Sequence, residues 1–196
     1  MNKFSLKMKF LKLIKYPLCK ILYKTYGFKS IIYKPIMING KKYIEIGKSV
    51  RFFTGARIEA IDTWGDKKYL PSIKIGNQTS FEQNVHITSA GKLEIGSNCV
   101  ILPNVLITNI NHNYDLPGVN VLKQSISVKE VTIGNNCFIG MGAKIFPGVH
   151  IGDNVIIGAN SIVMTDIPSF SVVVGTPAKI VKKFNQKTNE WVKIGE

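Results

Sequence analysis

The sequence predicts an all-β fold, a left-handed parallel β-helix of five three-faced coils, because a six-residue unit repeats along it. From Ile46 onward, fifteen units have Ile, Val or Phe at their first position, and eleven have a small residue at the fifth. Side chains alternate along a strand, so the fifth position and the next first position point inward and the sixth points outward. A β-sandwich of short strands, the alternative, has no reason to keep this phase through fifteen units.

The units form coils in groups of three. An Ile-Gly pair opens each group, with its glycine at Gly47, Gly76, Gly96, Gly134 and Gly152. These glycines are 29, 20, 38 and 18 residues apart, and eighteen residues make one coil of three faces. The surplus residues are loops that leave after a third face; the longest, 108–131, is inserted after the third coil. Asn98, Asn136 and Asn154 fall at the fourth position, where a corner needs left-handed backbone geometry.

The repeat divides the chain into three parts. Residues 1–40 precede it as a short helical segment, 41–168 form the β-helix, and 169–196 form a C-terminal strand, a tight turn and a basic tail. Helical spacing within 1–40 relates the apolar residues Phe10, Leu13, Ile14, Leu18, Ile21 and Leu22. Lysines surround this stripe, and Pro17 kinks or splits the helix. Two interpretations stay open and both can hold: the segment lies on an anionic membrane, or it caps the first coil.

Charge and composition limit the partners. The net charge of +14 favours nucleic acid, an anionic membrane surface or a phosphorylated small molecule. Only two of the 26 basic residues are arginine, the side chain that reads guanine, so we expect no nucleic-acid partner. No secretory leader pattern is visible, and we expect a cytoplasmic protein with peripheral contact at the inner face of the cytoplasmic membrane. Cys19, Cys99 and Cys137 lack metal or disulfide spacing, and the last two should stack as inert core residues.

The inserted loop contains the candidate catalytic residue, His112. Long loops in compact folds are usually functional or disordered, and an imidazole can take a proton near neutral pH. His86, His112 and His150 all fall at outward sixth positions. We expect His150 on the same face as His112, and His86 on a neighbouring face, from which it reaches His112 only across a subunit interface. For each, the alternative is a solvated surface histidine.

Four motifs carry a family resemblance: 133–140 (IGNNCFIG), 147–149 (PGV), 157–163 (IGANSIV) and 174–179 (VGTPAK). With the Asn-His loop they resemble the hexapeptide-repeat acyltransferase superfamily, within it the maltose, galactoside and surface-polysaccharide O-acetyltransferases. The resemblance implies a homotrimer with three active sites, each between two adjacent prisms. It also implies acetyl-CoA as cosubstrate, a sugar or glycan acceptor, no permanently bound cofactor and no metal.

The resemblance assigns site residues one by one. It matches His112 to the general base of the family. Asn109 stands where relatives often have an acidic residue, so we expect Asp115 or a main-chain carbonyl to orient the imidazole, with Tyr114 and His86 as further orienting or acceptor contacts. The positions that it matches to the CoA site are Phe138, Gly140, Met141, Gly142 and Ala159, followed at the phosphate end by Thr165, Lys179, Lys182 and Lys183. Phe138 replaces a tryptophan of many relatives.

Together these observations predict an acetyl-CoA-dependent O-acetyltransferase acting on a sugar hydroxyl in surface-polysaccharide (O-antigen or capsule) biosynthesis. His112 would take the hydroxyl proton during direct transfer, and backbone N–H groups of residues 140–143 would stabilise the oxyanion. One alternative is an antibiotic or xenobiotic O-acetyltransferase. The other is a metalloenzyme like the γ-carbonic anhydrases, which bind metal with three histidines across a subunit interface; the two closely spaced ligands on one strand are absent.

Overall fold

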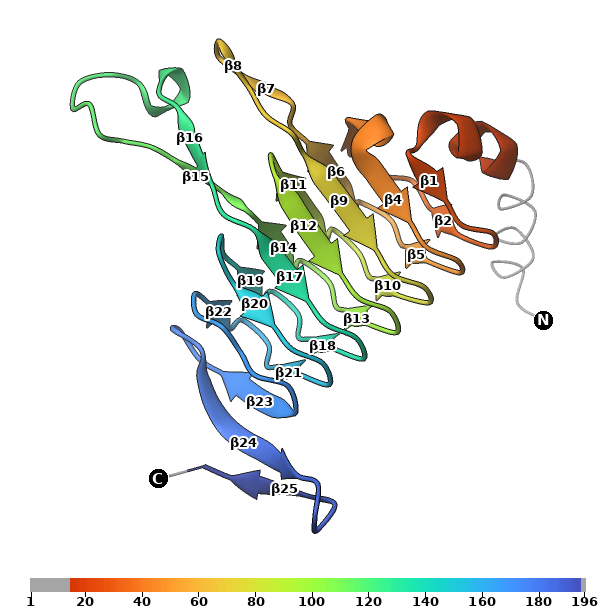
Figure 1. Cartoon of the computed structure of the whole chain (residues 1–196), viewed down its shortest axis with the longest axis vertical. Coiled ribbons are helices and arrows are strands. Elements are labelled where there is room, and N and C mark those ends of the chain that lie inside the picture. The colour runs from red at the N-terminus through yellow and green to blue at the C-terminus, as the bar shows by residue number, and fades with distance from the viewer. Residues whose placement is uncertain (1–14, 195–196) are drawn as a thin grey trace.

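The structure, a computed structural model that describes residues 15–194, is a three-sided prism of parallel strands (Figure 1). Sheet A contains β1 (Thr25–Tyr26), β4 (Ile44–Ile46), β9 (Ser72–Ile75), β12 (Lys92–Ile95), β17 (Val131–Ile133) and β20 (His150–Ile151). Sheet B contains β2 (Ile31–Ile32), β5 (Arg51–Phe52), β10 (Ser80–Phe81), β13 (Val100–Ile101), β18 (Phe138–Ile139), β21 (Ile156–Ile157), β23 (Ser171–Val174), β24 (Lys179–Asn185) and β25 (Glu190–Lys193). Sheet C contains β3 (Met37–Asn39), β6 (Arg57–Ala60), β11 (His86–Ser89), β14 (Leu106–Thr108), β19 (Lys144–Ile145) and β22 (Ile162–Val163). The chain visits the sheets in the order A, B, C, and the predicted parallel β-helix is confirmed.

The described residues form six complete coils, one more than the five predicted. The additional coil consists of β1, β2 and β3, which pair in parallel with β4, β5 and β6. Its inward residues Tyr26, Ile32 and Ile38 keep the six-residue spacing, and Gly27 follows Tyr26 as glycine follows isoleucine elsewhere. Part of the segment 1–40 therefore belongs to the β-helix. An aromatic residue at the first position, directly after a helical pattern, concealed this coil.

The interior is a set of ladders formed by equivalent side chains of successive coils. Phe52 and Phe81 stack with ring centroids 3.9 Å apart and an interplanar angle of 1°. Cys99 and Cys137 are buried, as predicted, and their thiols donate to the carbonyl oxygens of the next coil. The adjacent Cys99 sulfur and burial raise the pKa of the Cys137 thiol. Both cysteines are therefore core residues.

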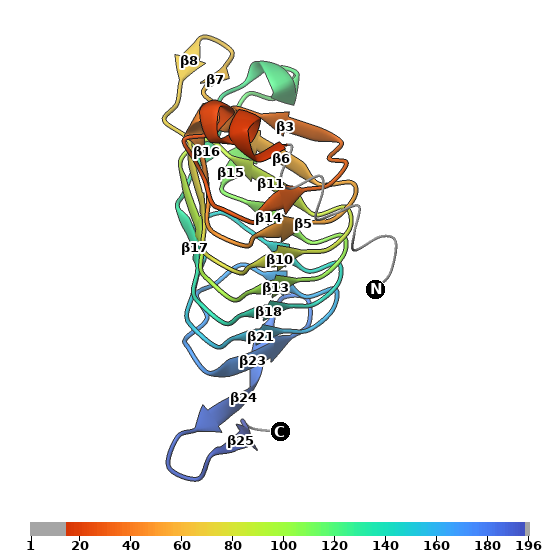
Figure 2. The same cartoon turned by 90° about the vertical axis from the view of Figure 1, so that its right-hand side faces the viewer.

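The corners confirm the predicted use of asparagine. Asn98, Asn136 and Asn154 have φ of 58°, 55° and 56°. Their short polar side chains tolerate this left-handed conformation better than branched residues do. Figure 2 shows the coils stacked one above another, and each coil turns from one sheet to the next at such bends.

The first coil is covered by helical residues 15–22 (Figure 1). Tyr16 and Cys19 pack against the core from this helix. The predicted apolar stripe stays largely exposed, since Leu18, Ile21 and Leu22 are 59 %, 81 % and 41 % exposed, and Leu18 and Leu22 line an open groove at the end of the first coil. The other predicted stripe residues, Phe10, Leu13 and Ile14, lie outside the described residues. The capping interpretation thus describes residues 15–22, but through a different face from the one predicted.

The opposite end of the prism has an antiparallel extension. β23 is the predicted strand, and after a turn at 175–178 the chain forms β24 and β25. The basic tail is therefore a hairpin that continues sheet B.

Two hairpins leave the prism from the corner between sheets C and A. The first is β7 (Thr63–Trp64) with β8 (Lys67–Lys68). The second, here called the arm (residues 109–130), contains β15 (Ile110–His112) and β16 (Ile126–Val128), with the 3₁₀ helix η2 (Val121–Lys123) near its tip. Both project to the same side in Figure 1. A further 3₁₀ helix, η1 (Lys41–Tyr43), follows β3.

Within residues 15–194, no helix combines the length and apolar character needed to cross a bilayer.

Candidate active site

The arm positions His112 outside the three sheets. His112 ends β15 and lies opposite Ile126 of β16. At the root of the arm Asn109 is fully buried; its Oδ1 accepts from the backbone N–H of Ala90 (3.0 Å) and its Nδ2 donates to the carbonyl of Lys92 (3.1 Å). The Asn109 amide therefore fixes the arm to the coil and is directed to backbone groups instead of the imidazole.

Trp64 of the first hairpin holds the imidazole from one side. The rings of Trp64 and His112 have centroids 4.9 Å apart at an angle of 60°. The indole Nε1 donates to the carbonyl of Gln124 (2.9 Å), and the Tyr69 hydroxyl donates to the carbonyl of Ile126 (3.3 Å). The two hairpins thus support each other. Sequence reasoning missed Trp64 because insertions have no repeat; the one available signal was that both insertions leave after a third face.

On its other side His112 opens to a groove of about 460 Å³. Tyr114, Asp115, Ser127, Phe146 and Met164 line this groove with His112. The structure therefore brings Tyr114 and Asp115 near the predicted base, but no hydrogen bond links Asp115 to the imidazole. The Nδ1 atom of His112 is enclosed and has no partner among the described residues.

The other two histidines lie apart from this groove. His86 is on sheet C, where its Nε2 is 2.7 Å from Thr88 Oγ1 and 3.3 Å from Glu59 Oε2. His150 is on sheet A, with its Nδ1 2.9 Å from Thr132 Oγ1. The expectation that His112 and His150 share a face is wrong, because the arm carries His112 off the sheet. Across residues 15–194, no group of three or more His, Cys, Asp or Glu residues is arranged to hold a metal ion.

The residues matched to CoA gather at a different corner, between sheets B and C. Phe138 begins β18 of sheet B, Met141 follows this strand and is 49 % exposed, and Ala159 occupies the equivalent corner one coil further on. The coils approach so closely here that a Cβ on Gly140 would lie 2.5 Å from the Ala159 nitrogen. We call the surface formed by Phe138, Gly140, Met141 and Ala159 the B/C edge.

Most backbone N–H groups of residues 140–143 are already occupied. Gly140 donates to Ile157, Gly142 to Pro103, and Ala143 to Gly140. Among residues 140–143, only the Met141 N–H makes no backbone hydrogen bond to a described residue. The predicted oxyanion donors are thereby reduced to Met141.

The residues matched to the CoA phosphates lie in two different places. Lys179 begins β24 after a turn that is joined to the B/C edge by the bond from the Ala178 N–H to the Ile162 carbonyl (2.8 Å). Lys182 and Lys183 follow on β24, opposite Val172 and Ser171. Thr165 lies instead in the exposed turn between sheets C and A. Within one chain, sheet C therefore lies between the His112 groove and the B/C edge.

Comparisons with known proteins agree with this architecture. Residues 130–164 match the family model described as bacterial transferase hexapeptide (six repeats). The chain is 30 % identical over 170 residues to the putative lipopolysaccharide biosynthesis O-acetyl transferase WbbJ of Escherichia coli K12, covering 83 % of each chain. It is 35 % identical over 125 residues to the galactoside O-acetyltransferase of the same strain, covering 63 % of this chain and 60 % of that one.

Solved structures share the fold at low sequence identity. AntD, an N-acyltransferase from Bacillus cereus in complex with dTDP and 3-hydroxybutyryl-CoA, superposes with a TM-score of 0.71 at 19 % identity, covering 89 % of this chain and 90 % of that one. A hexapeptide-repeat acetyltransferase from Vibrio cholerae complexed with acetyl-CoA gives a TM-score of 0.58 at 21 % identity, covering 89 % and 78 %. Both likenesses support a left-handed parallel β-helix.

Proposed function

The chain belongs to the hexapeptide-repeat acyltransferases, and from this premise we propose that it transfers an acetyl group from acetyl-CoA to a sugar hydroxyl, with His112 as general base. The observation that carries this proposal is the His112 imidazole, held between Trp64 and an open groove. A surface-polysaccharide precursor is the proposed acceptor, since the relative that the chain matches over most of its length is named for lipopolysaccharide biosynthesis.

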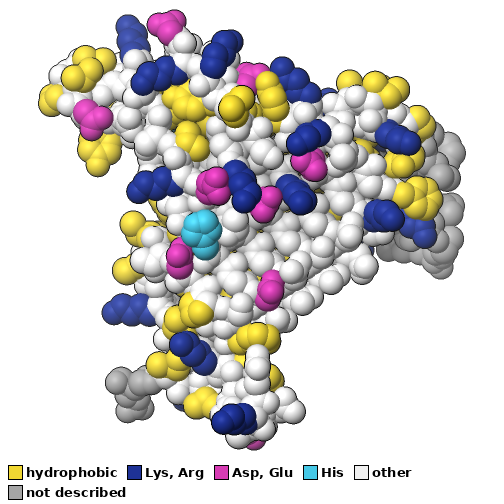
Figure 3. All heavy atoms as spheres, in the orientation of Figure 1, with side chains coloured by type: hydrophobic (Ala, Val, Ile, Leu, Met, Phe, Trp, Pro, Cys, Tyr) yellow, Lys and Arg dark blue, Asp and Glu magenta, His cyan; other side chains and the backbone are white. Residues whose placement is uncertain are grey.

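A complete site requires a second copy of the chain. His112 projects from the corner between sheets C and A, whereas Met141 and Ala159 lie at the B/C edge. Both regions expose apolar side chains: Tyr114, Leu116 and Leu122 on the arm are 79 %, 58 % and 66 % exposed. Figure 3 shows hydrophobic side chains gathered over the projecting arm. Such patches usually mark interfaces, which supports a trimer in which the arm of one subunit faces the B/C edge of the next.

The chemistry follows from this arrangement. His112 takes the proton of the acceptor hydroxyl as its oxygen attacks the thioester carbon. The oxyanion of the resulting intermediate accepts from the Met141 N–H of the neighbouring copy. When the intermediate collapses, the carbon–sulfur bond breaks and the CoA thiolate takes the proton from the imidazolium. The products are the acetyl ester and CoA, and His112 is returned to its starting state.

Subunit complementation tests this proposal. His112→Ala removes the base, and Ala159→Glu places a bulky carboxylate on the exposed B/C edge. Each variant alone should release little CoA from acetyl-CoA in the presence of acceptor. Trimers mixed at equal ratio should regain about one quarter of wild-type activity, because random assembly makes about three quarters of the trimers mixed and each mixed trimer has one intact site out of three. No recovery in verified mixed trimers would reject a shared site.

A membrane-proximal acceptor would also explain the outer face of residues 15–22. Leu18, Ile21 and Leu22 are exposed on a helix that carries Lys15 and Lys20. This arrangement supports contact with an anionic bilayer, through burial of the apolar side chains and attraction of the lysines. Ile21→Glu should reduce sedimentation with cardiolipin vesicles at low salt, while Leu70→Glu, an exposed apolar residue on the first insertion, should not. Equal sedimentation of Ile21→Glu and wild type would reject this contact.

A further inference from the structure

A second groove is lined in part by Trp64, the residue whose ring contacts His112. It has a volume of about 510 Å³, and the residues that line it include Asn39, Lys42, Glu59, Asp62, Thr63 and Trp64. These residues come from the first two coils and the first hairpin, at the same corner from which the arm leaves. Trp64 lines this groove and its ring contacts His112, which lines the other, so this one residue connects the two grooves.

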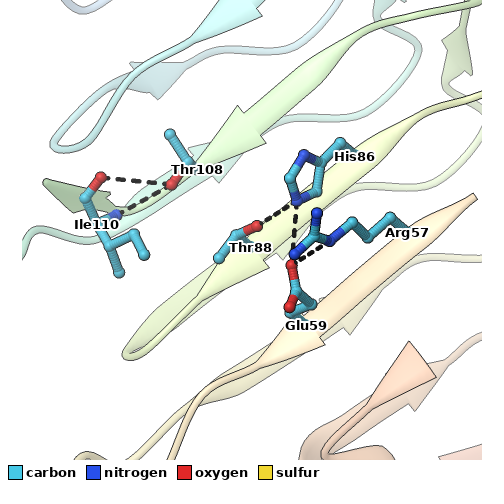
Figure 4. Close-up of polar contacts among 6 residues, drawn as sticks. All are labelled: Arg57, Glu59, His86, Thr88, Thr108 and Ile110. Atoms are coloured by element: carbon cyan, nitrogen blue, oxygen red, sulfur yellow. Dashed lines mark hydrogen bonds and ion pairs between the residues drawn. The ribbon is translucent and has the colours of Figure 1, made fainter. Parts of the chain in front are cut away.

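Glu59 is held in position by its neighbours on sheet C. Its Oε2 accepts from Arg57 Nε (2.6 Å) and lies 3.3 Å from His86 Nε2, which also contacts Thr88 (Figure 4). The side chain of Glu59 is only 13 % exposed. Both contacts use Oε2, and Oε1 makes no hydrogen bond to the described chain. A fixed carboxylate with one unused oxygen is suited to accept hydrogen bonds from a ligand.

Of the other polar residues that line this groove, Asp62 is bonded within the protein and Asn39 is available to a ligand. Asp62 is already engaged, since its Oδ2 accepts from the Tyr43 hydroxyl (2.8 Å) and lies 3.5 Å from Lys42 Nζ. These bonds lower the pKa of the Asp62 carboxyl, and the hydrogen bond from Tyr43 has the largest effect. The exposed Asn39 amide makes no hydrogen bond to the described residues. Asn39 and Glu59 therefore supply donor and acceptor capacity that the fold leaves unused.

We propose that this groove binds a second sugar unit of the acceptor, next to the unit that is acetylated at His112. The inference rests on the proposed function for the reacting unit. An indole offers a flat apolar surface to the C–H face of a sugar ring, and a few fixed polar groups around it give orientation and specificity. His86 accordingly acts by positioning Glu59, and is not itself an acceptor contact. The enzyme would thus require an acceptor of at least two sugars.

Binding to immobilised bacterial surface glycans, from single sugars to tetrasaccharides, tests the inference directly. Wild type should bind glycans of two or more sugars about tenfold more tightly than the matching single sugars, the scale of one or two lost polar contacts. His112→Ala should bind the same glycans as wild type. Glu59→Gln and Trp64→Ala should lose the preference for longer glycans. Lys67→Ala, an exposed change on the same hairpin but outside the groove, should retain it.

The outcomes separate the two proposals. If wild type binds no glycan on the array, or if Glu59→Gln binds like wild type, the second sugar site is wrong whatever the transfer assay shows. If glycans bind as expected but none of them receives radiolabelled acetyl from acetyl-CoA, the proposed function is wrong and the groove remains a glycan-binding site.

Discussion

Replacing His112 with alanine separates catalysis from folding, because the side chain lies outside the core. The principal packing contact that the change removes is the one with Trp64. Such an aromatic pair contributes about 0.5–1.5 kcal/mol, and this loss falls on the arm and not on the three sheets. The expected variant is therefore a folded protein with a somewhat looser arm.

The expected loss of activity is much larger than that contact can explain. General base catalysis contributes about 10²–10⁴-fold, which corresponds to a barrier increase of about 2.7–5.4 kcal/mol. A thiol reagent that detects released CoA would measure kcat at saturating acetyl-CoA, while calorimetry would verify that CoA still binds. We expect kcat to fall at least about a hundredfold with CoA affinity unchanged.

His150→Ala is the matched control, since His150 is another exposed imidazole bonded to a threonine on sheet A. Its activity should remain within about threefold of wild type. Activity of His112→Ala within the same range would refute the assignment of the base. Equal losses in both variants, reversed by added zinc, would favour the metalloenzyme alternative.

Three further predictions concern the scaffold. Asn109→Ala leaves two buried backbone groups unsatisfied and should lower the free energy of unfolding by about 1–3 kcal/mol, measured by chemical denaturation; a change below the error of that measurement would contradict the role given to its amide. Trp64→Phe removes the indole N–H from the arm and should raise amide hydrogen exchange in residues 110–128 on a timescale of minutes, whereas unchanged exchange would show that the hairpin does not hold the arm. Cys99 and Cys137 are buried in the core, so a thiol reagent cannot reach either sulfur in the folded protein. Both should therefore react only after denaturation, and rapid labelling of either in the folded protein would contradict their placement.

The repeating part of the molecule was predictable because one physical rule governs every unit. Because side chains alternate along a strand, the repeat predicted that Val105 and Ile107 point into the core, where both are buried. Residues in excess of eighteen per coil predicted the two insertions, after Ile61 and Thr108. The asparagines at the corners were predicted from their fourth position in the same six-residue unit. The first coil was overlooked because Tyr26 replaces the usual isoleucine and a helical pattern ends immediately before it.

The site was only partly predictable, because its contacts join segments that have no repeat. Nothing local relates Trp64 to His112, which are 48 residues apart in the chain. The exposure of Ile21 also could not be predicted locally, because the helix has a second face, with Tyr16 and Cys19, that has helical spacing too. Packing against the first coil decides that Tyr16 and Cys19 contact the core. The role of Asn109 depended on a corner whose buried backbone donor and acceptor, the Ala90 N–H and the Lys92 carbonyl, come together only after the coils are stacked.

Both insertions leave the prism at one corner, and this has a consequence for how such proteins diversify. The B/C edge is formed from repeat units, where a methyl group on Gly140 would collide with the next coil, so its sequence can change little. The hairpin and the arm carry no such constraint, because each begins and ends at a corner without altering the stacking of the coils. Exchange of residues 61–71 and 109–130 between relatives should therefore transfer a large part of the acceptor preference while the thioester donor stays the same. Variation in acceptor preference would then be concentrated in these two segments and in the few coil residues that line the grooves, such as Glu59, without a change in how the coils stack.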